Sequence, residues 1–143
     1  MPEITINYWS ILAAAIANMI VGMLWYGPLF GKQWKKLMGF SNDDMKKMKM
    51  TPMQAMIGGL ITSLIMAYVL AHSAFMWNLF FAGSVSDFMF ALQLAVWIWL
   101  GFVATTQISS VLWEGRPWKL FFLNASNTLV SLIAMAMILT FWK

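Results

Sequence analysis

The chain contains no cysteine and very little charge. Without cysteine it can form no disulfide, no thiolate metal site and no thiol nucleophile. Charged residues make up 10% of the sequence and apolar residues 62%, whereas soluble domains average about 25% charged and about 45–50% apolar residues. A soluble fold of this length could not bury so much apolar surface, because small domains keep a large fraction of their surface exposed. The composition therefore predicts a membrane protein.

Four apolar segments are each long enough to cross a bilayer, which takes about 20 helical residues. They cover about residues 8–27, 52–72, 87–113 and 117–142 of a single domain, 1–143. Helices are expected because four strands cannot close a barrel and an open sheet leaves its backbone unpaired in lipid. Thr51 and Gln54 form a capping-box pattern around Pro52, and Ser86 can cap the third segment. The predicted fold is an all-α antiparallel bundle of four transmembrane helices.

The basic residues fall on one side of this predicted bundle. The N-terminal tail and the loop 73–86 contain no Lys or Arg, whereas Arg116 and Lys119 follow the third segment. By the positive-inside rule, both basic loops lie in the cytoplasm and both termini lie outside. Because the charge is clustered at membrane ends, the overall positive charge does not indicate nucleic-acid binding. The loop 28–51 carries six lysines: Lys32, Lys35, Lys36, Lys46, Lys47 and Lys49.

The loop 28–51 also has features of short helices lying on the membrane surface. Ser41 precedes Asp43 and Asp44 as a helix cap would, and Trp34 and Phe40 supply apolar contacts for an interface. The six lysines either bind anionic membrane lipids or serve only to set the topology. Membrane lipids are the partners that this pattern predicts.

Small residues recur every four positions along the second segment and match a second stripe on the first. Such spacing lets helix backbones approach closely, which drives helix association in lipid. We expect either a close antiparallel pair between these two segments or contact with another copy in a homo-oligomer. The residues are Ala14 and Gly22 on the first segment, and Ala55, Gly59, Ser63, Ala67 and Ala71 on the second.

Amides and hydroxyls lie well inside the predicted spans and should face the bundle. Interhelical hydrogen bonds are the simpler interpretation, and each contributes only about 0.6 kcal/mol on average. The alternative is a hydrated cavity or binding groove. Its predicted lining residues are Asn18, Gln93, Thr106, Asn124 and Asn127.

No residue pattern indicates catalysis, a metal or a cofactor. No Asp, Glu, Lys or Arg lies at mid-membrane depth, where proton-coupled carriers place a relay. His72 and Asp87 end and begin successive segments, but one His with one acid makes a weak metal corner. Their positions at helix ends already explain both residues. We therefore expect a protein that is not an enzyme.

Two similar stretches end the first and third segments. Trp25-Tyr26-Gly27-Pro28 is followed by Trp34-Lys35, and Trp113-Glu114-Gly115-Arg116-Pro117 by Trp118-Lys119. A duplicated helical hairpin would explain the echo. The preference of Trp, Gly, Pro and Lys for cytoplasmic helix ends is the simpler explanation.

The stretch 18–35 resembles a known family. Asn18, Gly22, the run Trp25 to Pro28, Phe30, Gly31, Trp34 and Lys35 are similar to the membrane proteins grouped as domain of unknown function 1761. The resemblance implies a four-span protein of the bacterial inner membrane and implies no activity. We expect a protein that binds or passes a small molecule, lipid or ion as an oligomer, or else a structural or partner-binding subunit of a membrane complex.

Overall fold

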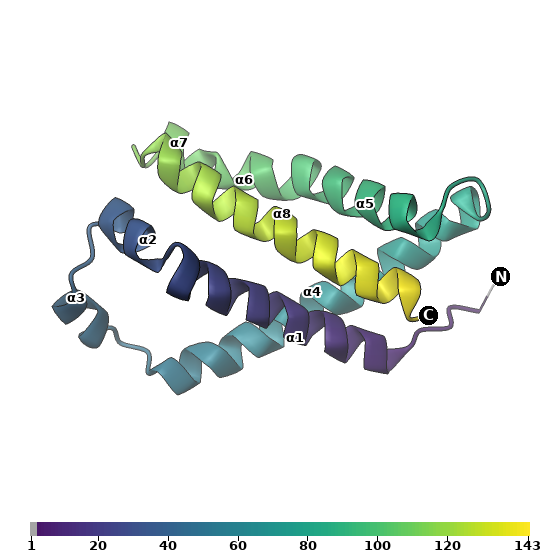
Figure 1. Ribbon diagram of the computed structural model, residues 1–143, viewed down its shortest axis with the longest axis horizontal. Helices are drawn as coiled ribbons and strands as arrows, with labels where there is room; N and C mark the ends of the chain where they lie inside the picture. Colours follow the sequence, from purple (N-terminus) through teal and green to yellow (C-terminus); the bar gives the residue numbers. More distant parts are fainter. Residues whose placement is uncertain (1–2) are drawn as a thin grey trace.

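The computed structural model describes residues 3–143, and this part of the chain is helical without any strand. Four helical units are long and apolar enough to cross a membrane, which confirms the predicted class. In Figure 1 consecutive units run in alternate directions. They are α1 (Tyr8–Leu24) with η1 (Trp25–Leu29); α4 (Pro52–Phe81); α5 (Asp87–Ile98) with η2 (Trp99–Ala104), α6 (Thr105–Gln107) and α7 (Ser109–Leu112); and α8 (Trp118–Phe141).

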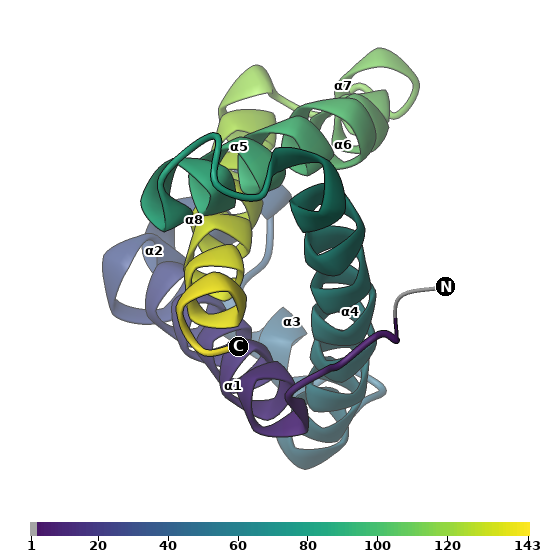
Figure 2. The ribbon, with the colours of Figure 1, turned by 90° about the vertical axis from the view of Figure 1, so that its right-hand side faces the viewer.

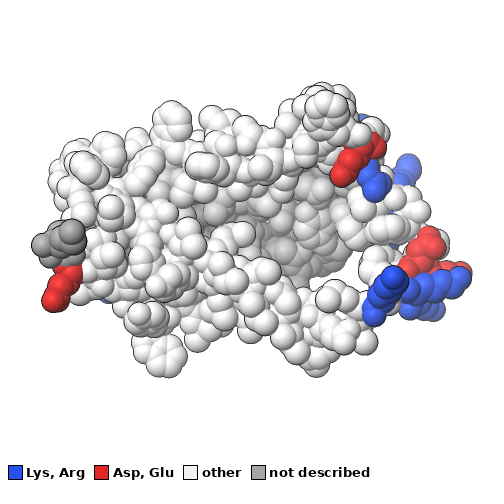
Figure 3. All heavy atoms as spheres, turned by 180° about the vertical axis from the view of Figure 1, so that it is seen from behind, with Lys and Arg blue, Asp and Glu red and all other residues white. Residues whose placement is uncertain are grey.

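The two ends of the bundle differ in charge. Both chain termini and the turn 82–86 lie at one end, here called the terminal end (Figure 1). The short helices α2 (Gly31–Met38) and α3 (Asn42–Lys46) lie at the other. Figure 3 shows most of the visible blue and red atoms gathered at that second end, with a nearly uncharged surface between. We call it the basic end, after the six lysines of 28–51 with Arg116 and Lys119.

Local capping explains where four of the helices begin. The Thr51 hydroxyl accepts the Gln54 N–H, and the Gln54 side chain accepts the Thr51 N–H, at 3.2 and 3.1 Å. Ser86 caps α5 by accepting the Met89 N–H, and Ser41 caps α3. These three predictions are confirmed. The cap of α1 was not predicted: Asn7 Oδ1 accepts the Trp9 N–H at 3.0 Å.

Two helices extend beyond the predicted ends of their spans. The helix begun at Pro52 does not end at residue 72 but continues to Phe81. Residues 73–81 contain no Gly or Pro, and the next glycine with positive φ is Gly83. The first span likewise passes through Gly27-Pro28 to Leu29, as the π-helical turn η1. Its Phe30 N–H bonds to Trp25 O at 2.9 Å, which accommodates a proline without an N–H.

The buried core lies in the half of the bundle nearest the terminal end. It joins the beginnings of α1 and α5 to the ends of α4 and α8. The helix α8 packs between α1 and α5, whereas α4 packs mainly on α1. Figure 2, viewed from the terminal end, shows the four spans arranged in a ring. Toward the basic end few large side chains are buried. The buried core contains no residue from the range 16–66. The basic end is therefore more open than the terminal end.

Candidate functional site at the basic end

Two tryptophans hold the first half of α8 from opposite sides. Trp25 Nε1 donates to Leu123 O at 3.0 Å, and Trp99 Nε1 donates to Ala125 O at 2.8 Å. Residues two apart on a helix point about 200° apart. Each tryptophan is also the first residue of a π-helical segment. Spans one and three therefore fix α8 at nearly the same depth.

This symmetry is not the one that the sequence echo predicts. Trp113, the counterpart of Trp25 in the echo, is 87% exposed. The residue that matches Trp25 in structural role is Trp99, which lies 14 positions earlier in the chain than Trp113. Trp25 and Trp113, which correspond in the sequence echo, therefore do not make equivalent contacts.

A tyrosine and two amides lie beside the Trp25 contact. The Tyr26 hydroxyl donates to Asn124 Oδ1 at 2.8 Å, and Asn127, one turn further along α8, faces the same phenol. Asn127 Oδ1 and Gln107 Oε1 are both buried, and neither accepts a hydrogen bond from the described residues. The cluster ties the end of the first span to α8 by polar contacts where the apolar core is absent.

The helix α2 is folded back on this cluster at close range. Gly31 is buried, and a Cβ at this position would lie 2.6 Å from Tyr26 O. Trp34 packs edge-on against both Tyr26 and Phe40, with ring centroids 5.7 Å apart in each pair. Only a glycine permits this approach of two backbones. The turn at Phe30-Gly31 therefore sets where α2 lies relative to α8.

A groove of about 520 Å³ lies between α2 and the first turns of α8. Its volume falls within the range of about 300–1,000 Å³ typical of ligand sites. Its lining residues are Trp25, Phe30, Gln33, Lys36, Leu37, Lys119, Phe122, Leu123 and Ser126.

The groove is lined by one face of each of its two helices. On α8 the lining residues follow the spacing i, i+3, i+4, i+7 from Lys119 to Ser126, and on α2 they follow i, i+3, i+4 from Gln33 to Leu37; both spacings describe a single helix face. The α8 face is about 10 Å long. It is cationic at its outer edge, aromatic in the middle and apolar with one hydroxyl at its deep end.

Neither lysine of the groove has a carboxylate partner. Among residues 3–143 the ion pair found is Lys143 with Asp87, at the opposite end of the bundle. Of the acids near the basic end, Asp44 is engaged in the α3 cap, where its Oδ2 accepts the Ser41 N–H at 2.8 Å. This backbone hydrogen bond holds the pKa of Asp44 below its ordinary value. The groove therefore presents positive charge that α3 does not neutralise.

The five predicted lining residues do not converge on one cavity. Asn124 and Asn127 lie together beside Tyr26. Asn18 instead donates from Nδ2 to Ser63 Oγ at 2.7 Å, which joins α1 to α4. Gln93 is exposed, and so is Thr106, whose hydroxyl bonds back to Phe102 O at 2.7 Å. Asn18 thus makes an interhelical hydrogen bond, as expected of an amide with a structural role.

The small residues of the second segment are mostly turned toward α1. Gly59 approaches Met19, since a Cβ there would lie 3.2 Å from Met19 Sδ, and Ser63 and Ala67 are buried. Ala71 packs against the core, whereas Ala55 is exposed. On the first segment Ala14 is fully buried, but a Cβ at Gly22 would meet nothing within 4 Å.

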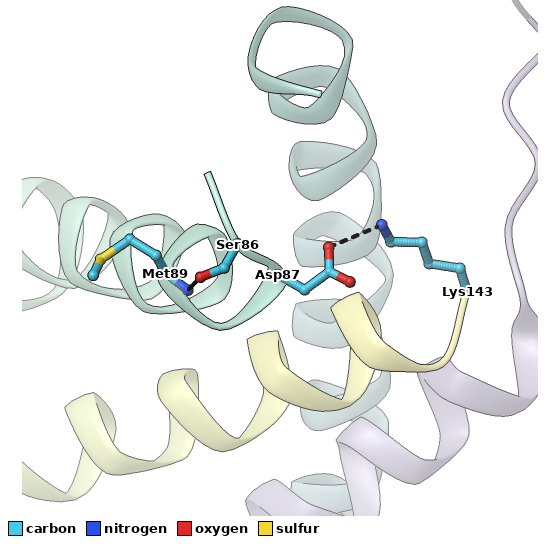
Figure 4. A network of polar contacts seen from close by, with 4 residues as sticks. All are labelled: Ser86, Asp87, Met89 and Lys143. Atoms are coloured by element: carbon cyan, nitrogen blue, oxygen red, sulfur yellow. Dashed lines mark hydrogen bonds and ion pairs between the residues drawn. The ribbon is translucent and has the colours of Figure 1, made fainter. Parts of the chain in front are cut away.

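The remaining candidates are not assembled into a metal site. His72 Nδ1 lies 2.8 Å from Tyr68 O, so this nitrogen carries the proton in that contact. Asp87 pairs with Lys143 at 3.5 Å (Figure 4). Within residues 3–143 no group of three metal-ligating side chains is found.

Sequence reasoning gave no site role to Trp99, to Gly31 or to most of the groove residues, among them Gln33, Lys119, Phe122 and Leu123. Of the six lysines predicted to meet lipid, Lys36 is the one that lines the groove. Lys119 was interpreted as a topology signal only. Its spacing of three, four and seven residues to Phe122, Leu123 and Ser126 was the available signal.

The spans and their distribution of charge define a multi-pass membrane protein. The chain belongs to the family described as protein of unknown function, DUF1761, which it matches over residues 9–140. This match confirms the resemblance seen in the stretch 18–35. No curated protein and no solved structure matches the chain.

Proposed function

We propose that this protein is a non-enzymatic membrane protein that binds a membrane amphiphile in the groove between α2 and α8. The observation that carries the proposal is the groove itself, with its polar edge and apolar depth along a single face of α8. A lipid has the same order of polarity from headgroup to chain.

The orientation of the groove follows from the basic residues. We propose that the basic end faces the cytoplasm of a bacterial cell, in accordance with the positive-inside rule. The helices α2 and α3 would then lie on the inner surface of the plasma membrane. Lipid of the inner leaflet would enter the groove from the side.

The alternative function, a subunit that assembles through its small-residue stripe, is less well supported. Such a stripe should remain open for a partner. Instead Asn18, Ser63 and Ala67 are engaged within one chain. A homo-oligomer stays a prediction, but lipid binding in this groove does not require one.

A steric block tests the proposal. Ser126 is exposed at the deep end of the groove, so Ser126→Trp would fill it without disturbing a buried side chain. We expect the wild-type protein, purified in mild detergent, to retain one phospholipid per chain in native mass spectrometry, and Ser126→Trp to retain none.

The matched control is Thr105→Trp. Thr105 is exposed on the third span and, like Ser126, bonds its hydroxyl back to its own helix, here to Gly101 O at 2.8 Å. This variant should keep the lipid. Equal lipid retention by the wild type and Ser126→Trp would contradict the proposal.

A further inference from the structure

We infer that the occupant of the groove is an anionic phospholipid whose phosphate is held jointly by Lys36 of α2 and Lys119 of α8. This inference rests on the proposed function and adds the class of headgroup. Lys36 and Lys119 come from separate helices, separated by 83 positions in the chain, and both line the same groove.

The remainder of the groove edge suits a phosphate diester. Gln33 lies one turn before Lys36 on the same face of α2, and its amide can donate to a further phosphate oxygen. Two ammonium groups and one amide form a donor set for an oxyanion. Within residues 3–143 no carboxylate lines the groove, so no acidic side chain there would repel a negative headgroup.

The acyl chains would follow the α8 face inward from the lysines. Phe122 is 60% exposed and offers its ring to an apolar chain. Leu123 and Ser126 follow, and the Ser126 hydroxyl is already satisfied by Phe122 O at 2.6 Å. This deep part of the groove therefore needs no polar group from a ligand.

The other lysines of the basic end do not belong to this site. Lys46 ends α3 and Lys47 follows it, and neither lines the groove. They carry the same charge on a neighbouring segment. They therefore make a matched control that separates a specific site from a general attraction between a basic surface and anionic lipid.

The test measures headgroup preference in detergent solution containing equal amounts of phosphatidylglycerol and phosphatidylcholine. Native mass spectrometry then counts each lipid bound to the full chain. Each basic residue near an anionic membrane surface strengthens attraction to that surface about fivefold, which sets the scale expected for each lysine. We expect the wild type to prefer phosphatidylglycerol by at least tenfold, and Lys36→Gln with Lys119→Gln to retain one lipid without preference.

Lys46→Gln with Lys47→Gln should keep the preference of the wild type. The inference is overturned if the groove variant keeps its preference, or if both double variants lose it equally. It is also overturned if inorganic phosphate at millimolar concentration displaces phosphatidylglycerol, since the site would then recognise a free anion. Absence of any retained lipid in the wild type would instead contradict the proposed function itself.

Discussion

Gly31 is the residue on which the geometry of the basic end most depends. Its backbone lies so close to Tyr26 O that an added Cβ would stand 2.6 Å from that oxygen. The obstacle is backbone, which cannot rotate away as a side chain can. The position of α2, and with it one wall of the groove, therefore depends on a missing side chain.

We expect Gly31→Ala to destabilise the protein by about 1–3 kcal/mol, as overpacking does elsewhere, and to weaken lipid retention. Gly27→Ala is the control, because a Cβ at Gly27 meets nothing within 4 Å. It should be neutral or slightly stabilising, since alanine favours helix over glycine. Reversible unfolding in mixed micelles measures both. Equal stability of the two variants would show that α2 is not held at Gly31.

The sequence predicted single residues well where the signal is local. The caps Ser41, Thr51 and Ser86 depend on residues three positions away, so pattern alone finds them. The partner of Asn18 lies 45 positions further along the chain. The sequence could predict that the partner lies on another helix, but not that it is Ser63. Lys119 was missed as a site residue for the same reason, since its relation to Lys36 exists only after folding.

At the scale of elements, α8 is the helix against which the first and third spans are positioned. The apolar core holds it near the terminal end, and two indole N–H groups hold it near the basic end. Both hydrogen bonds reach carbonyl groups of α8 in addition to its own helical bonds. Two π-helical segments, each beginning at one of these tryptophans, accompany the contacts.

Replacing either tryptophan by phenylalanine removes the donor and keeps an aromatic ring. We expect Trp25→Phe and Trp99→Phe each to destabilise the protein by about 0.6 kcal/mol, the average for interhelical hydrogen bonds in membranes, and by no more than about 1.7 kcal/mol. Trp97→Phe is the control, because Trp97 is 61% exposed and makes no such bond. Unfolding in mixed micelles again measures the effect. If Trp97→Phe lowered the stability as much as the other two variants, the loss of stability would be caused by the smaller ring rather than by the missing hydrogen bonds.

Element boundaries were predictable only where a strong stop signal stands. Gly83 lies beyond a long apolar run, so α4 extends nine residues past the expected end at residue 72. Pro28 was interpreted as a stop, yet a π-helical turn carries the chain through it. Hydropathy reports the minimum length that crosses a bilayer, not the length that the helix attains.

For the whole molecule, the separation of charge between the ends predicts how it is inserted. We expect Lys47→Cys to react with a membrane-impermeant maleimide only in inverted vesicles, and Ser84→Cys only in intact cells. The chain has no cysteine of its own, so each label reports one position. Labelling of both from the same side would refute four alternating spans, and exchange of the two sides would refute the proposed orientation.

The class of the molecule was predictable from composition alone, because a chain with 62% apolar residues needs lipid. Its function was not predictable in that way. The predicted polar lining residues were chosen for depth in the membrane. The groove is instead built at the edge, from residues that a span-by-span interpretation assigns to anchoring, such as Trp25 and Lys36.

The central claim is that lipid occupies the groove between α2 and α8, and photo-crosslinking tests it most directly. Phosphatidylglycerol carrying a diazirine in one acyl chain is reconstituted with the full chain in vesicles of phosphatidylcholine, which competes for the groove. After irradiation, the modified residues are identified by peptide mass spectrometry. We predict crosslinks concentrated at Phe122, Leu123 and Ser126, reduced by Lys36→Gln with Lys119→Gln. Crosslinks spread evenly over the exposed faces of α4 and α5, unchanged by that variant, would contradict the claim.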